Sequence, residues 1–145
     1  MGALSGNQLY PKGKQALLEK KINVEDTSGT DQLKCALMST SYTSDDGNEF
    51  FNSISGNQVG SSVALASTAI TVSGTSVTVD AANVTFSSVS AGSTIGKIVI
   101  YVAGATPGSD DYLLVYFDND GSSISLATNG GDITVSFNAS GIFAL

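Results

Sequence analysis

With 145 residues, of which 41% are apolar and 13% charged, the chain fits one domain whose surface is solvated mainly by Ser, Thr, Gly and Asn. The net charge is −7 and all six basic residues are lysines, which argues against nucleic-acid binding because phosphate and base contacts need clustered Lys and Arg. The absence of histidine excludes Ser-His and Cys-His catalytic pairs, and a single cysteine is too little for a zinc site.

The first residues differ in character from the rest of the chain. Residues 1–9 are small and polar, so we predict an extended N-terminal arm there, and one β-sandwich domain over residues 10–145. The opening has neither the charged start nor the apolar stretch of a signal peptide, and no window reaches the length of a membrane span. We therefore expect a protein that is made in a cytoplasm and has no membrane partner.

One helix is predicted near the start, over residues 11–22. Pro11 suits the first helical position, and the residues that follow are good helix formers. Leu17, Leu18 and Ile22 would form a narrow apolar stripe, which suits a helix lying on the edge of a sheet or on a neighbour. Residues 26–30 are predicted as a turn.

The lysines are concentrated at this end of the chain. Residues 1–35 hold five lysines and four acidic residues, a net charge of +1, whereas the remainder holds one lysine and nine acidic residues, a net charge of −8. Two interpretations stand side by side. Either a basic N-terminal segment docks on an acidic partner surface, or the lysines only solvate the helix.

The next segment contains the cysteine and a short aromatic run. Residues 33–38 are predicted as a strand with Cys35 as a buried structural thiol, and residues 39–47 as a polar loop. Residues 48–54 suit a short helical turn that buries Phe50, Phe51 or Ile54.

From residue 63 onward the pattern is β. Residues 69–73 and 76–80 alternate apolar with polar on either side of Gly74-Thr75, which predicts a hairpin whose strands each bury one face. After a strand that begins at Val84, residues 98–102 and 112–117 are continuous apolar runs joined by a Pro and Gly loop. Continuous runs predict strands that are covered on both faces.

The last segments bracket a second turn signal. Residues 123–126 and 132–137 flank Asn129-Gly130-Gly131, which predicts another hairpin. Residues 141–145 are too apolar for a frayed tail, so we expect them to be packed. Many short strands joined by Gly, Asn and Ser turns indicate a mainly β fold, an antiparallel β-sandwich of jelly-roll type with one short N-terminal helix.

Acidic residues provide the remaining candidate chemistry. Asp45 with Asp46 and Asp110 with Asp111 lie in predicted loops, where carboxylates are ordinarily solvated, and there is no tryptophan platform for a sugar. Residues 118–121 are similar to the start of a calcium loop, but they lack its downstream Glu and also suit a turn, which we favour. We therefore predict no enzyme, no cofactor and no small-molecule substrate.

Several short motifs, taken in order, resemble small structural proteins of tailed-phage virions. They are Leu9-Tyr10-Pro11-Lys12-Gly13-Lys14, Lys34-Cys35-Ala36-Leu37, Tyr42-Thr43, Asp80-Ala81-Ala82-Asn83-Val84-Thr85-Phe86 and Gly130-Gly131-Asp132-Ile133-Thr134-Val135. Such proteins are similar to capsid decoration, or cement, proteins. The resemblance implies a homotrimer that binds the major capsid protein on the outer face of the shell and stabilises it.

The alternative is a receptor- or carbohydrate-binding module on a tail or fibre, which an exposed aromatic pair in a groove would favour. For either function, we expect the partner contacts to come from the helix and the apolar terminus. The candidate contact residues are Tyr10, Lys12, Lys14, Leu17, Leu18, Phe143 and Leu145.

Overall fold

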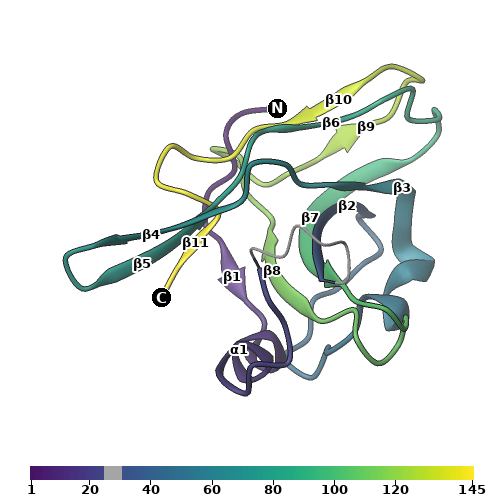
Figure 1. Cartoon of the computed structure of the whole chain (residues 1–145). Helices are drawn as coiled ribbons and strands as arrows, with labels where there is room; N and C mark the ends of the chain where they lie inside the picture. Colours follow the sequence, from purple (N-terminus) through teal and green to yellow (C-terminus); the bar gives the residue numbers. More distant parts are fainter. Residues whose placement is uncertain (25–30) are drawn as a thin grey trace.

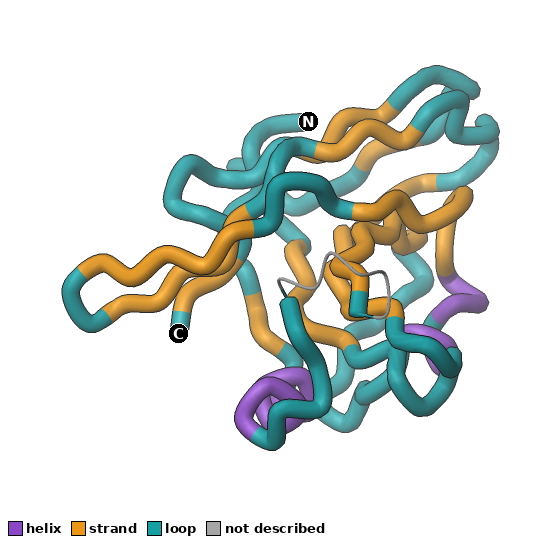
Figure 2. Tube along the Cα trace, in the orientation of Figure 1, coloured by secondary structure: helices purple, strands orange, loops and turns teal. Residues whose placement is uncertain are grey.

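The computed structural model describes residues 1–24 and 31–145, and it is mainly β with antiparallel sheets and one α-helix near the N-terminus, as predicted (Figures 1 and 2). The elements follow the chain as β1 (Gln8–Leu9), α1 (Pro11–Leu18), β2 (Gln32–Ser39), the 3-10 turns η1 (Phe51–Ser53) and η2 (Ser55–Asn57), β3 (Gln58–Ala64), β4 (Ala69–Ser73), β5 (Ser76–Asp80), β6 (Val84–Phe86), β7 (Thr94–Ala103), β8 (Leu113–Phe117), β9 (Leu126–Ala127), β10 (Ile133–Val135) and β11 (Phe143–Ala144). The predicted turn over residues 26–30 lies outside the described residues.

A six-stranded sheet forms the centre of the fold. Its order is β1-β8-β7-β2-β3, with β9 paired to the start of β7, and its neighbours are antiparallel. Strands β7 and β8 contain the two continuous apolar runs, and most of their residues are buried. The prediction that both faces of these strands are covered is confirmed, because successive residues belong to two different clusters.

The larger cluster lies between one face of the central sheet and two small sheets. Leu37, Ile98 and Ile100 from the central sheet pack there with Phe86 of β6 and Phe143 of β11. The small sheets are the pair β10-β6 and the three-stranded sheet β11-β5-β4. This gives the sandwich-like arrangement, and the Cys35 thiol lies fully buried inside it.

The other face of the central sheet carries a smaller, more aromatic cluster. The sheet contributes the fully buried Val99 and Leu113, and the predicted helical turn contributes Phe51 and Ile54, which are both buried. Phe51 stacks on Tyr101 with ring centroids 4.0 Å apart. The fold is therefore layered on both sides of one sheet.

The hydroxyls of Tyr10 and Tyr42 meet in this cluster at 2.5 Å, and the Tyr42 hydroxyl donates to the Asn48 carboxamide oxygen at 3.1 Å. Burial raises the pKa of Tyr10, and its hydrogen bond to Tyr42 raises it further. Burial likewise raises the pKa of Tyr42, of Tyr101 and of the Cys35 thiol. These four groups are therefore held in their neutral forms.

The fold is expected to lose stability in alkali. The folded state holds these protons more tightly than the unfolded chain, so this contribution is complete below the unfolded pKa values, near 9 for Cys and 10 for Tyr, and is lost as the pH rises above them. Denaturant unfolding at pH values on either side of 10 should show the decline, and a Tyr101→Phe variant should decline less steeply. A free energy of unfolding that stays constant above pH 10 would contradict this.

The helix is shorter than predicted, and it buries a different face. It ends at Leu18 because Lys20 adopts a left-handed conformation (φ 57°) and the Lys21 amide donates to the Ala16 carbonyl, which closes the C-terminus in a Schellman-type turn. Its buried residues are Gly13 and Ala16, whereas Leu18 is 84% exposed. The predicted stripe is therefore wrong for Leu18, which lies in solvent, whereas Leu17 packs against the main core and Ile22 is buried in it just beyond the helix.

The hairpin around Gly74 is confirmed, with Ala69 opposite Asp80 and Ser73 opposite Ser76. Gly74 has a φ of 60°, which the tight two-residue turn requires. The expectation that each strand buries one face fails for β4, because all five of its residues are exposed. The hairpin projects from the body of the molecule, so no part of the described chain lies over its outer part (Figure 1).

The second predicted hairpin, around Asn129-Gly130-Gly131, is wrong. β9 pairs with β7, and β10 pairs with β6, so the turn carries the chain from one sheet to another. The turn bonds to a neighbouring loop, since the Gly130 amide donates to the Val89 carbonyl and the Val89 amide donates to the Gly131 carbonyl. A Gly-rich turn suits a corner between sheets as well as a hairpin.

Both ends of the described chain pack on the body. Residues 1–9 are extended, with Leu4 buried and β1 added to the edge of the central sheet beside β8. Near the other end, β11 pairs with β5, and Ile142 and Phe143 are buried, as expected for the apolar terminus. No described helix is long and apolar enough to cross a membrane.

Candidate functional site

The acidic residues singled out in the sequence form turns. The Asn119 carboxamide oxygen accepts a hydrogen bond from the Gly121 amide at 2.7 Å, and the Asp118 carbonyl accepts one from the Ile124 amide at 2.9 Å. Residues 118–121 thus take the turn geometry. Within residues 1–24 and 31–145 there is no group of three or more His, Cys, Asp or Glu side chains arranged to hold a metal ion.

Asp111 is the one carboxylate among the described residues that is largely buried, at 5% exposure. One of its oxygens accepts the Asn52 amide at 2.6 Å and the other accepts the Gly108 amide at 2.5 Å. Its backbone carbonyl also accepts the Phe51 amide at 2.8 Å. Asp111 therefore fastens the loop between β7 and β8 to η1, which is a structural task.

The hollow beside Asp111, of about 270 Å³, includes the aromatic pair Phe51 and Tyr101 in its lining. The two rings stack face to face and are only 7% and 6% exposed, so they offer no open platform to a sugar ring. The exposed aromatic pair that would favour a carbohydrate-binding module is not found at this hollow.

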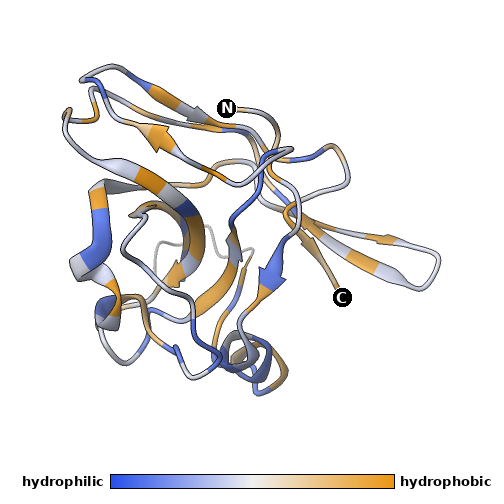
Figure 3. Ribbon diagram, turned by 180° about the vertical axis from the view of Figure 1, so that it is seen from behind, coloured by the Kyte–Doolittle hydropathy of each residue, from blue (hydrophilic) through white to orange (hydrophobic). Residues whose placement is uncertain are grey.

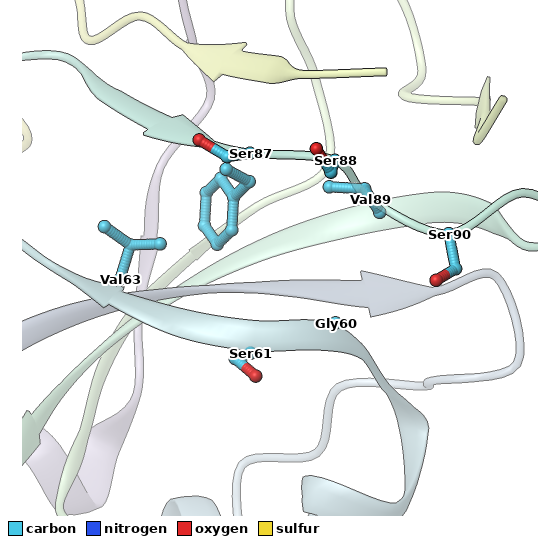
Figure 4. A pocket seen from close by; sticks show the side chains of 8 residues that line it. Gly60, Ser61, Val63, Ser87, Ser88, Val89 and Ser90 are labelled. Carbon is cyan, nitrogen blue, oxygen red and sulfur yellow. The ribbon is translucent and has the colours of Figure 1, made fainter. Parts of the chain in front are cut away.

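A second hollow, of about 250 Å³, lies between β3 and the segment that follows β6 (Figure 4). Residues 60–62 bulge here, because β3 uses four steps from Val59 to Val63 opposite two steps of β2. The hollow is lined by Gly60, Ser61, Val63, Phe86, Ser87, Ser88, Val89 and Ser90. These residues offer hydroxyls and backbone groups and no side chain that titrates near neutral pH.

The exposed large hydrophobic side chains, and not the hollows, mark the candidate contact regions of this protein. Among the described residues they are Met1, Leu18, Ile70, Val72 and Leu145. Apart from Met1, they fall on two regions, the helix α1 and the sheet β11-β5-β4. Large exposed apolar side chains that gather in one place commonly mark contact sites.

The first region, which we call the α1 surface, consists of Lys12, Lys14, Leu18, Lys20 and Lys21, all of them exposed. Glu19 lies among them and pairs with Lys21 at 2.6 Å, which lowers the pKa of the Glu19 carboxyl and raises that of the Lys21 ammonium. The α1 surface therefore combines a cluster of positive charge with one leucine that lies almost fully in solvent.

The second region is the outer part of the three-stranded sheet. Pairing places Ile70 opposite Val79, and Val72 opposite Val77, so that their side chains share one face of the sheet. Phe143 and Leu145 extend this face on β11. The opposite face carries polar residues such as Thr71, Ser73 and Thr78.

Only the inner part of this apolar face is covered. Val79 and Phe143 are 4% and 2% exposed, whereas Ile70, Val72 and Leu145 are 41%, 69% and 58% exposed. We call the outer residues Ile70, Val72, Val77 and Leu145 the hairpin surface; Figure 3 shows apolar segments along this projecting arm. Covering the three most exposed of them would contribute roughly 3–5 kcal/mol per copy.

The candidate contact residues divide between surface and core. Lys12, Lys14, Leu18 and Leu145 are exposed, and Leu17 is partly buried. Tyr10 and Phe143 are 1% and 2% exposed and offer no surface to a partner. Sequence reasoning missed Ile70 and Val72 because their alternation was assigned to a buried face.

No family model, no curated protein and no solved structure compared with the chain matches it.

Proposed function

We propose that this protein is a non-enzymatic structural protein of a tailed-phage virion, which decorates the outer face of the capsid shell and stabilises it. It is made in the host cytoplasm and acts on the virion surface. Its partners are the major capsid protein and other copies of itself, as a homotrimer. The proposal needs no cofactor, nucleic acid, membrane or small-molecule substrate.

The observation that carries the proposal is the placement of the exposed hydrophobic side chains. Four of the five in the described chain lie on the α1 surface and the hairpin surface, which are formed by separate elements. The order of short motifs resembling virion proteins adds to this. A protein with two contact surfaces on one packed core can link neighbouring subunits.

The mechanism is geometric. A decoration protein that touches two subunits at once holds them together through several modest contacts, and linked contacts bind far more tightly than each contact alone. The helix α1 packs on β8 of the central sheet, and β5 and β11 join the same core through Val79 and Phe143, so one core connects the two surfaces. Shell expansion must then break the contacts on both surfaces together.

Binding of the purified chain to shells is the direct test. Undecorated shells built from the major capsid protein are mixed with the chain, sedimented and quantified, and the same chain is counted in purified virions. A copy number comparable to that of the shell protein supports the proposal. A few copies per particle would favour the tail or fibre module instead, and absence from particles would overturn both.

The α1 surface is expected to provide the charged part of this contact. A Lys12→Glu and Lys14→Glu double variant should weaken shell binding by about tenfold or more and reduce its dependence on salt, because the net change of four charges opposes an acidic partner surface. Lys34→Glu, on β2 and outside the α1 surface, is the control. Equal binding by both variants would show that the lysines only solvate the helix.

A further inference from the structure

We infer that the hairpin surface, Ile70, Val72, Val77 and Leu145, is where one copy of this chain contacts another. The inference deepens the proposed function by naming the surface used for self-association. The sheet β11-β5-β4 has one face of large apolar residues and an opposite face of mainly Thr, Ser and Ala. A sheet of this kind is stable when its apolar face is covered.

The body of the same chain covers this apolar face only at the inner end of the sheet. There Val79 and Phe143 belong to the main core, and beyond them the apolar face continues outward on the projecting hairpin (Figure 2). Val72, near the turn, is the most exposed residue of the face, at 69%. The apolar face of the sheet therefore extends beyond the part of it that the body of the molecule covers.

Charge identifies the occupant as a second copy. Residues 69–79 carry no charged side chain, and Asp80, at the inner end of β5, lies on the opposite face. The hairpin surface therefore offers nothing to complement a charged partner and nothing that repels another hairpin. The chain as a whole carries −7, so two copies repel each other wherever their acidic parts approach. The hairpin projects from the body of the molecule (Figure 1), so a contact between two hairpins leaves the two bodies apart.

The geometry of sheets suits such a contact. Two sheets pack face to face through apolar, β-branched side chains at a spacing of about 10 Å, and Ile70, Val72 and Val77 present such a face. Two copies meeting across a twofold axis, or three meeting around a threefold axis, would both cover it with the same residues. The mass of the complex distinguishes these arrangements.

The test compares two aspartate variants on adjacent residues of β4. Val72→Asp places a charge on the apolar face, whereas Thr71→Asp places the same charge on the polar face, and both positions are exposed. Sedimentation of the isolated chain over a range of concentrations should show self-association for the wild type and for Thr71→Asp, and about tenfold or greater weakening for Val72→Asp. Thermal unfolding confirms that each variant folds.

Cysteine cross-linking gives a second readout that does not depend on charge. Under mild oxidation, Val72→Cys should form a disulfide-linked pair of chains much faster than Thr71→Cys. Equal rates, or a wild-type chain that stays monomeric at every concentration, would overturn the inference.

Because neither experiment contains a shell, self-association through the hairpin without shell binding would overturn the proposed function alone. Shell binding without it would overturn this inference alone.

Discussion

Replacing Gly13 with alanine is expected to destabilise the protein by about 2–3 kcal/mol, although the same change in an exposed helix adds up to about 1 kcal/mol of stability. A Cβ at this position would overlap the carbonyl oxygen of Leu113 and lie 3.1 Å from the Cα of Leu114. Both atoms belong to the backbone of β8 in the central sheet, which cannot move aside because β8 is paired with β7 and β1. The helix would have to lift from the sheet.

Chemical denaturation of the variant and the wild type measures this effect. Lys14→Ala is the matched control, because it lies on the same helix, is exposed, and should change the free energy of unfolding by less than about 0.5 kcal/mol. A Gly13→Ala protein as stable as the wild type would mean that α1 is not held against β8 as closely as described.

Replacing Asp111 with alanine is expected to cost about 3–4 kcal/mol. The change removes the acceptor of two short amide hydrogen bonds, from Asn52 and Gly108, and hydrogen bonds to a charged group contribute more than neutral ones. It leaves the loop between β7 and β8 held to η1 only by the backbone hydrogen bond from the Phe51 amide to the carbonyl of residue 111. The expected result is a lower free energy of unfolding, together with faster proteolysis within residues 104–110.

Asp110→Ala is the control for this variant. It removes the same charge from the adjacent position, whose side chain is partly exposed, and should change stability by less than about 0.5 kcal/mol. If both variants lost stability equally, the cause would be the loss of negative charge and not the two hydrogen bonds of Asp111.

The sequence was sufficient to predict the central strands and the first hairpin. Residues 98–102 and 112–117 have no polar alternation, and a run of this kind is stable only where both faces are covered, as β7 and β8 are. Gly74-Thr75 between two alternating segments predicts the hairpin because both the turn and the register are local properties. These features depend on a few adjacent residues.

Long-range pairing could not be predicted in the same way. Asn129-Gly130-Gly131 has the composition of a hairpin turn, but β9 and β10 pair with β7 and β6, which lie far away in the sequence. The helix face was misjudged for a similar reason. Gly13 and Ala16 are buried because α1 lies close to a strand backbone, and their small size gave no apolar signal of its own.

The candidate surfaces were only partly predictable. Leu18 and Leu145 were identified as contact residues and are exposed, at 84% and 58%. Val72 was missed because an alternating strand has the same sequence whether its apolar face is covered or projects beyond the body. Exposure of that face is a property of the whole arrangement and not of the strand.

The thiol of Cys35, on β2 of the central sheet, is fully buried, so its reactivity reports on local or global unfolding of the sandwich. Because it is the single cysteine of the chain, any reaction with a thiol reagent occurs at one known atom. That atom becomes accessible only when the sheet separates from the layers above it. The labelling rate, followed with and without a bound partner, would therefore measure how strongly assembly holds the molecule closed.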